Sequence, residues 1–202
     1  MRLTGLPRFD WIRANTHVPA LDIGCEDGKV FQGWELERYV VRCDIDRWNH
    51  PNFVQCDAQE LPFRDDQFRT AVLGEILEHV RYPEKVIREA MRVSRRVVIS
   101  TPLENDWDSN ALPHTNTMQD ITKKYGSLDN FYHSEKQRNA NLLEKVSDLK
   151  EPHSFHIREW SMDSFRELME RTVKDGWIFS MEERKIGNFA FILCIMKKDE
   201  NQ

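Results

Sequence analysis

The chain has 202 residues, a formal net charge of -5 at pH 7 and a hydrophobic content of 40%. These values are typical of a soluble protein with one core, so we expect a single domain over residues 1–202. The acidic balance argues against a surface built to hold nucleic acid. The sequence has no run that approaches the ~18 apolar residues of a membrane helix and no signal peptide, which favours a cytoplasmic protein without a membrane partner.

The positions of the four cysteines also fit a cytoplasmic protein. Cys25, Cys43, Cys56 and Cys194 all lie in or beside apolar runs, and no two of them have CxxC spacing. This pattern predicts reduced thiols in the core, and it favours neither disulfides nor a zinc site.

Up to about residue 100, short apolar runs alternate with segments of helical pattern. Strands are predicted over residues 19–23, 39–43, 52–56, 70–74 and 96–100. The clearest helical pattern covers residues 84–95, where Val86, Ile87, Ala90 and Met91 share one face. Such alternation is typical of βαβ units around a parallel sheet.

Pro102 ends this regular pattern. Residues 103–152 are polar and contain no strand-like run. A segment of this kind within a compact domain usually has a function of its own. We therefore predict that residues 103–152 form a lid or a substrate-recognition insertion.

The regular pattern resumes at Ser161, which we predict to be the N-cap of a helix terminated by Gly176. Two apolar runs follow, over residues 177–183 and 189–196, on either side of Gly187-Asn188. A turn pair between two such runs favours an antiparallel hairpin, which we place at the edge of the sheet.

Acidic residues stand at the ends of four successive predicted strands. The first strand runs into LDIGCEDG at residues 21–28, where glycine lets the backbone approach a ligand closely. Asp44 lies 20 residues after the first glycine of this turn, the spacing of the carboxylate that holds ribose hydroxyls in dinucleotide-binding folds. Asp46 is a second candidate for that role. Asp57 ends the third strand and Glu75 follows the fourth, so the pattern favours a ligand that contains a nucleoside.

Together these motifs resemble the methyltransferase type 11 branch of the class I enzymes that use S-adenosylmethionine. The resemblance rests on LDIGCEDG at 21–28, CDID at 43–46, CDAQELPF at 56–63 and FRTAVLGEILEHV at 68–80, and it covers residues 19–102. It implies an α/β fold with a Rossmann-like, doubly wound and mostly parallel seven-stranded sheet that ends in a C-terminal antiparallel hairpin. It also implies S-adenosylmethionine as the cofactor.

The resemblance assigns cofactor-binding roles along one edge of the sheet. Asp22, Gly24, Cys25 and Gly28 would line the methionine side, Asp44 and Ile45 the ribose and adenine face, and Asp57 and Ala58 the adenine amino group. Glu75 would face both the cofactor and the substrate cavity. The chain departs from the family at Glu26, where a glycine is usual, and at Arg69, where aspartate is favoured. A side chain at position 26 puts the shape of the turn and the affinity for the cofactor in question.

The sequence EILEH at residues 75–79 suggests a divalent cation. In a helix that begins at Glu75, the side chains of Glu75, Glu78 and His79 would share one face, and with His156 they could hold Mg²⁺ or Mn²⁺. This arrangement resembles the glutamate and histidine sites of small-RNA 3′-end 2′-O-methyltransferases and ubiquinone-pathway O-methyltransferases. The segment HIREW at 156–160 resembles a downstream element of the RNA enzymes. Metal-free type 11 enzymes also carry ExxEH, so both interpretations stay open.

Three functions are compatible with these residues. The first is methyl transfer to an O or N atom of a small molecule or glycan, with Glu75, His79 and His156 as candidate catalytic groups, because an imidazole can take a proton near neutral pH. The second is metal-assisted 2′-O-methylation of an RNA end. The third is a non-catalytic binding or regulatory protein with the same fold. Basic residues between 81 and 96 are interleaved with Glu84 and Glu89, which favours a solvated helix face over a nucleic-acid site.

Overall fold

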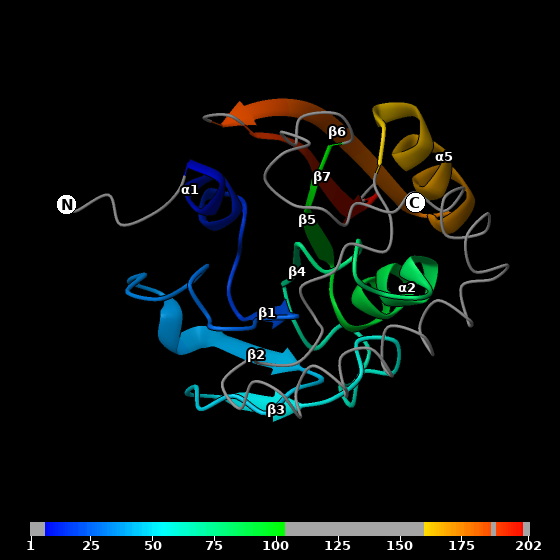
Figure 1. Cartoon of the computed structure of the whole chain (residues 1–202). Coiled ribbons are helices and arrows are strands. Elements are labelled where there is room, and N and C mark those ends of the chain that lie inside the picture. The colour runs from blue at the N-terminus through cyan, green and yellow to red at the C-terminus, as the bar shows by residue number, and fades with distance from the viewer. Residues whose placement is uncertain (1–6, 104–159, 187–188, 200–202) are drawn as a thin grey trace, which may run out of the picture.

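The structure is a computed structural model of the chain, and it describes residues 7–103, 160–186 and 189–199. Its centre is a seven-stranded sheet in the order β3-β2-β1-β4-β5-β7-β6 (Figure 1). The strands are β1 (Ala20–Ile23), β2 (Val40–Asp44), β3 (Phe53–Gln55), β4 (Thr70–Gly74), β5 (Arg96–Pro102), β6 (Trp177–Ile186) and β7 (Phe189–Lys198). Strands β1 to β5 pair in parallel, whereas β7 runs antiparallel to both β5 and β6. The predicted fold class is therefore confirmed, and β6 alone forms the edge beyond β7.

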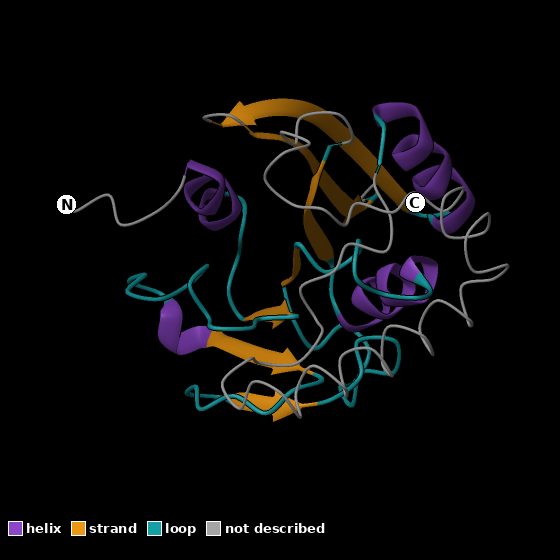
Figure 2. Ribbon diagram, viewed as in Figure 1, coloured by secondary structure: helices purple, strands orange, loops and turns teal. Residues whose placement is uncertain are grey.

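Helices cover the two faces of the sheet unequally. Among the described residues the helices are α1 (Pro7–Ala14), α2 (Pro83–Val93) and α5 (Met162–Thr172), with a short 3-10 turn, η1 (Glu37–Tyr39). Figure 2 shows α2 and α5 side by side, with α1 apart from them on the other side of the sheet. The larger core packs Ile87 of α2 and Leu168 of α5 against one face, and the smaller core packs Ile12 of α1 against the other. None of the described helices is long and apolar enough to cross a membrane.

The strands form where the sequence predicts them, and the central ones are buried on both faces. Every residue of β1 is buried, and so is all of β5 after its first residue, as expected for parallel strands between two layers. The amphipathic helix is also confirmed, although α2 begins at Pro83, where proline costs no hydrogen bond, and ends at Val93.

The predicted alternation of strands and helices is wrong for most of the first half. Within the described residues, only α2 forms a full helix between two parallel strands. The connection from β1 to β2 consists of turns, and its Gly24, Gly28 and Gly33 have φ angles of 70°, 72° and 72°. An α-helix does not accommodate this left-handed conformation. Apolar side chains such as Phe31, which has no exposed surface, cover the sheet in place of a helix.

The start of α5 is confirmed and its predicted terminator is not. The Ser161 hydroxyl accepts the backbone N–H of Ser164 at 3.1 Å, and the Ser164 hydroxyl accepts the N–H of Ser161 at 2.9 Å, which makes a capping box. The helix ends at Thr172, before Gly176. Gly176, with a φ of 81°, instead turns the chain into β6. Of the predicted insertion at 103–152, only Leu103 lies within the described residues, where it forms a β-bridge with Trp160.

Candidate active site

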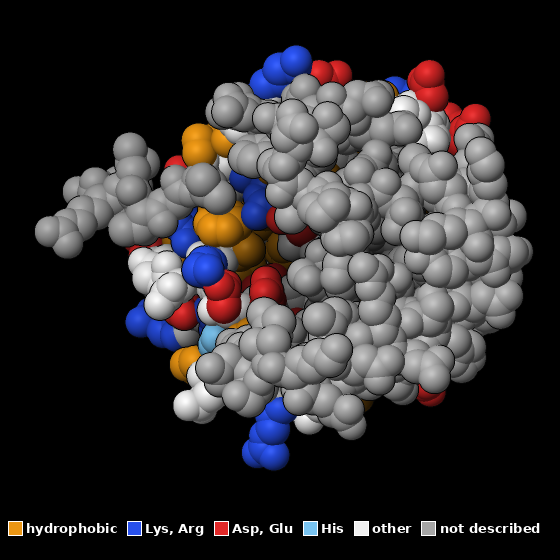
Figure 3. Space-filling view, in the orientation of Figure 1, with side chains coloured by type: hydrophobic (Ala, Val, Ile, Leu, Met, Phe, Trp, Pro, Cys, Tyr) orange, Lys and Arg blue, Asp and Glu red, His pale blue; other side chains and the backbone are white. Residues whose placement is uncertain are grey.

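A cavity of about 1270 Å³ opens at the carboxyl ends of β1, β2 and β4. Open α/β sheets bind their ligands at this edge. Figure 3 shows acidic and basic side chains around a hollow with hydrophobic side chains inside it. Seven of the nine residues predicted to bind the cofactor lie in the cavity wall: Gly24, Cys25, Asp44, Ile45, Asp57, Ala58 and Glu75.

The turn after β1 forms one wall of the cavity. The backbone N–H groups of Gly24 and Cys25 both donate to the Cys43 carbonyl, at 2.9 and 3.1 Å, which ties the turn to the end of β2. A Cβ atom on Gly24 would lie 2.7 Å from Cδ1 of Ile76. Glycine is thus needed at this position both for the backbone angle and for the close contact.

Glu26 occupies a backbone conformation that favours glycine. Its φ is 41°, which gives a physical reason for the glycine usual in the family. The Glu26 N–H donates to Oδ2 of Asp44 at 2.9 Å, and its carbonyl accepts a hydrogen bond from Nε2 of His50 at 2.7 Å. These two contacts hold the backbone in the left-handed conformation despite the side chain.

Asp44 connects the turn after β1 with the turn after β2. Its Oδ2 accepts the Glu26 N–H, and its Oδ1 accepts the N–H of Asp46 at 3.0 Å. A carboxylate has about four acceptor positions, so two backbone bonds leave capacity for the hydroxyl groups of a ribose. Asp46 also lies in the cavity wall, but Asp44 is the carboxylate that bonds to both turns.

An apolar surface lies beside these carboxylates. Ile45 is 57% exposed, and with Ala58 it offers a flat apolar contact in the wall. Trp48 is a further wall residue, which sequence reasoning missed. Its ring stacks on His50 with centroids 6.0 Å apart and an interplanar angle of 12°. An aromatic residue so soon after Asp44 was the signal that could have identified it.

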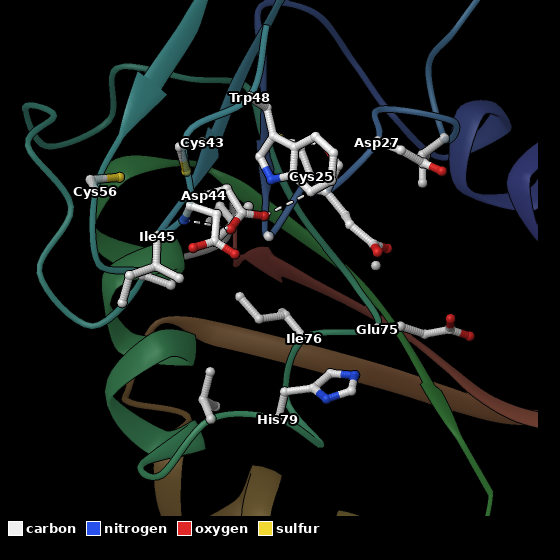
Figure 4. A pocket seen from close by; sticks show the side chains of 18 of the residues that line it. Cys25, Asp27, Cys43, Asp44, Ile45, Trp48, Cys56, Glu75, Ile76 and His79 are labelled. Carbon is white, nitrogen blue, oxygen red and sulfur yellow. Dashed lines mark hydrogen bonds between the residues drawn. The ribbon is translucent and has the colours of Figure 1, made fainter. Parts of the chain in front are cut away.

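The helix predicted to begin at Glu75 is absent. Residues 75–79 form a turn, and Glu75 has a φ of 67°, so the helical spacing on which the metal hypothesis rested does not apply. The Glu75 carboxylate pairs with Arg8. His79 lies in the cavity wall on the other side of Ile76, and Figure 4 shows its ring well apart from the Glu75 carboxylate.

Glu78 lies outside the cavity wall and is 1% exposed. It accepts a hydrogen bond from Oγ1 of Thr101 at 3.2 Å, and burial raises the pKa of its carboxyl group. Glu75, Glu78 and His79 therefore do not converge. Within the described residues, no group of three histidine, cysteine or acidic side chains is placed to hold a metal ion. The remaining predicted ligand, His156, lies outside those residues.

Asp22 and Gly28 were predicted to line the cofactor site, and neither lies in the cavity wall. Successive side chains of a strand point to opposite faces, so Asp22 lies beneath the β1–β2 connection, beside Arg42 of β2. Burial raises the pKa of Asp22 to about 7, and the positive charge of Arg42 opposes that shift. A Cβ atom on Gly28 would lie 3.0 Å from Cε1 of His50 and 3.2 Å from Nε of Arg42. Both residues therefore lie beside Arg42, behind the cavity wall.

Helix α1 contributes two wall residues, Arg8 and Phe9, for which the sequence held no motif. The Arg8 guanidinium lies 5.0 Å from the ring centroids of both Phe9 and Phe191. Burial lowers the pKa of Arg8 to about 10, so its side chain stays charged at neutral pH. The two aromatic rings and the carboxylate of Glu75 thus hold the positively charged guanidinium of Arg8 at one end of the cavity.

Comparison with known proteins relates part of the chain to a family. Residues 21–97 match the family described as a methyltransferase domain. This part of the chain is a class I methyltransferase domain of the type 11 branch. The match begins within β1, includes β2 to β4 and ends within β5, and the family uses S-adenosylmethionine. The search of curated proteins gives no match for the methyltransferase.

Solved structures with the same fold are distant in sequence. A possible histamine N-methyltransferase from Thermotoga maritima is 12% identical, with a TM-score of 0.56 over 95% of this chain and 87% of that one. A putative methyltransferase from Bacillus halodurans is 15% identical, with a TM-score of 0.54 over 96% and 98%. The cyclase SpnF is 12% identical, with a TM-score of 0.59 over 95% and 80%. Identities this low relate the methyltransferase to these proteins by fold alone, since one fold can host different reactions.

Proposed function

We propose that this methyltransferase transfers the methyl group of S-adenosylmethionine to an oxygen or nitrogen atom of a small molecule or glycan. The observation that carries the proposal is the composition of the cavity, with Asp44 and Asp57 in one part of the wall and His79 and Glu75 in another. Its volume of about 1270 Å³ exceeds the roughly 300–1,000 Å³ of most ligand pockets, which leaves room for a cofactor and a compact acceptor together.

The described residues fit the cofactor. Asp44 has acceptor capacity for ribose hydroxyls, Ile45 and Ala58 offer an apolar contact for adenine, and Asp57 can accept from its amino group. The close backbone approach at Gly24 and Cys25 suits the methionine part. When bound, S-adenosylmethionine supplies a methyl group on a sulfonium, which an attacking atom receives by in-line displacement.

His79 and Glu75 are the proposed groups on the acceptor side. The half-buried imidazole of His79 can take the proton that a hydroxyl or amine loses when it is methylated. Arg8 holds the Glu75 carboxylate through an ion pair, so Glu75 acts as a fixed acceptor of hydrogen bonds from the substrate. His156 stays a prediction from the sequence.

The segment 103–152 is proposed to complete the acceptor site. The support comes from its described neighbours. Leu103 follows the carboxyl end of β5 and pairs with Trp160, so the chain leaves the sheet and rejoins it at the edge that bears the cavity. Because the described residues on either side of it, Leu103 and Trp160, lie at this edge of the sheet, the segment suits a role in acceptor recognition.

Two measurements test this function. Calorimetry should detect binding of S-adenosylmethionine to the purified protein, and absence of binding at millimolar cofactor would refute the assignment. Methyl-labelled cofactor is then incubated with the protein and with cell extract separated into small molecules, glycans and RNA. Label in the small molecules or glycans supports the proposed acceptor class, whereas label confined to RNA contradicts it.

A pair of histidine variants tests the proposed base. His79→Gln should bind the cofactor but transfer label at least about 100-fold more slowly, which is the usual contribution of a general base. His17→Gln is the matched control, because His17 is exposed and precedes β1 at the opposite edge of the sheet. Equal rates in both variants would remove His79 from the mechanism.

A further inference from the structure

Two thiols lie together in the wall of the cavity. Cys43 is in β2, and Cys56 directly follows β3. Cys43 is paired in register with Val54, so Cys56, two residues further along, lies on the same face of the sheet. Their side chains are close enough for each thiol to shift the pKa of the other. Figure 4 shows the two sulfur atoms turned toward one another from the ends of adjacent strands.

The two thiols differ in access and in acidity. Cys43 is 1% exposed, whereas Cys56 is only half-buried. The neighbouring Cys43 lowers the pKa of the Cys56 thiol, whereas Cys56 and burial raise the pKa of the Cys43 thiol. Because the reactive thiolate must be accessible to an oxidant, the more exposed Cys56 is the nucleophile of the pair, and Cys43 is the neighbouring thiol that can attack it.

We propose that Cys43 and Cys56 form an oxidant-sensitive dithiol, whose conversion to a disulfide by hydrogen peroxide lowers the affinity of the cavity for the cofactor. In the first step the Cys56 thiolate attacks one peroxide oxygen, the O–O bond breaks, and a sulfenic acid and hydroxide form. In the second step the Cys43 thiol attacks the Cys56 sulfur, the S–S bond forms, and the oxygen leaves as water. The two sulfur atoms are oxidised by two electrons, and the peroxide is reduced.

The position of the pair explains why the bond would affect the cavity. Each cysteine directly precedes a carboxylate of the wall, Asp44 after Cys43 and Asp57 after Cys56. A disulfide requires the two sulfur atoms to lie ~2.05 Å apart, so the backbone at both carboxylates must shift with them. This inference rests on the proposed function, in which Asp44 and Asp57 hold the nucleoside.

The remaining described thiols are less suited to this chemistry. Cys25 is 5% exposed, and burial raises the pKa of its thiol. Cys194 has no exposed surface, lies in β7, and burial raises the pKa of its thiol to about 12. Cys194 therefore provides a control position that is distant in the sheet from the pair.

The experiment treats the reduced full-length protein with hydrogen peroxide. Peptide mass spectrometry after alkylation of free thiols reports which cysteines are linked, and calorimetry measures S-adenosylmethionine affinity before oxidation, after it, and after dithiothreitol. We expect a 43–56 disulfide and an affinity that falls about tenfold or more, equivalent to the loss of one charge-assisted hydrogen bond, and then recovers on reduction. In Cys56→Ala the ratio of affinities before and after peroxide should stay near one, and Cys194→Ala should respond as the wild type does.

Three results would overturn the inference: no 43–56 linkage after peroxide, a complete linkage with unchanged affinity, or an undiminished response in Cys56→Ala. Cys43→Ala gives a second variant for the same comparison and should also lose the response. Failure of the reduced wild-type protein to bind S-adenosylmethionine is a separate outcome, which would contradict the proposed function. Mapping of the disulfide still decides in that case whether the pair is reactive.

Discussion

Variants of Asp44 can distinguish its role in binding the cofactor from its role in stabilising the turn after β1. In the wild type each carboxylate oxygen accepts one backbone N–H, from Glu26 at 2.9 Å and from Asp46 at 3.0 Å. Asp44→Ala removes both bonds together with the charge. Asp44→Asn keeps the size of the side chain and one carbonyl acceptor, so it chiefly removes the charge and one backbone bond.

The two effects have different magnitudes. A hydrogen bond to a charged group contributes about 1.5–3 kcal/mol, so Asp44→Ala should weaken S-adenosylmethionine binding by roughly 10- to 150-fold. The two backbone bonds are partly exposed, and water can replace them in the variant. Their loss should therefore lower the free energy of unfolding by only about 1 kcal/mol in total. Asp44→Asn should lose most of the affinity and less of the stability.

Calorimetry with S-adenosylmethionine measures the first effect and urea unfolding measures the second. Asp46→Ala is the matched control, because it removes a carboxylate from the same wall of the cavity without breaking the bonds that Asp44 makes. Unchanged affinity in Asp44→Ala would contradict the proposed cofactor site. A loss confined to Asp46→Ala would move the ribose contact to Asp46.

Three further predictions concern stability, each measured by urea unfolding. Glu26→Gly should raise the free energy of unfolding by about 1 kcal/mol, because Glu26 has a φ of 41°, and a decrease would show that its side chain stabilises the turn. The pKa of Asp22 is raised to about 7, so the folded protein holds this proton more tightly than the unfolded chain does, and stability should fall as pH rises from about 4 to about 7. The free energy of unfolding should be lower by about 2 to 4 kcal/mol at the higher pH, and Asp22→Asn should abolish this pH dependence. If the free energy of unfolding of the variant changes with pH as steeply as that of the wild type, other groups cause the dependence. Ser161→Ala breaks the capping box of α5 and should cost about 1 kcal/mol, whereas Ser180→Ala, at an exposed position of β6, should have little effect.

Local pattern was enough to predict the sheet, and together with the family resemblance it predicted much of the cavity wall. Buried strands need continuous apolar runs, and residues 70–74 were predicted with the bounds that β4 has. Because parallel strands all end at one edge, the residues that follow β2 and β3, such as Ile45 and Asp57, meet in one cavity whatever the connections between strands do. The N-cap at Ser161 was predicted for the same reason, because a helix cap depends on neighbouring residues.

The tertiary structure decided the parts that depend on backbone angles and on distant partners. A left-handed residue at Glu75 replaced the expected helix with a turn, and so separated Glu75 from His79. Spacing in the sequence does not reveal such an angle when the residue is not glycine. Arg8 reaches the cavity only because α1 packs beside the sheet. There Arg8 forms an ion pair with Glu75, which is far from it in the chain. Periodicity carries information about near neighbours, whereas packing alone determines which distant side chains share a cavity.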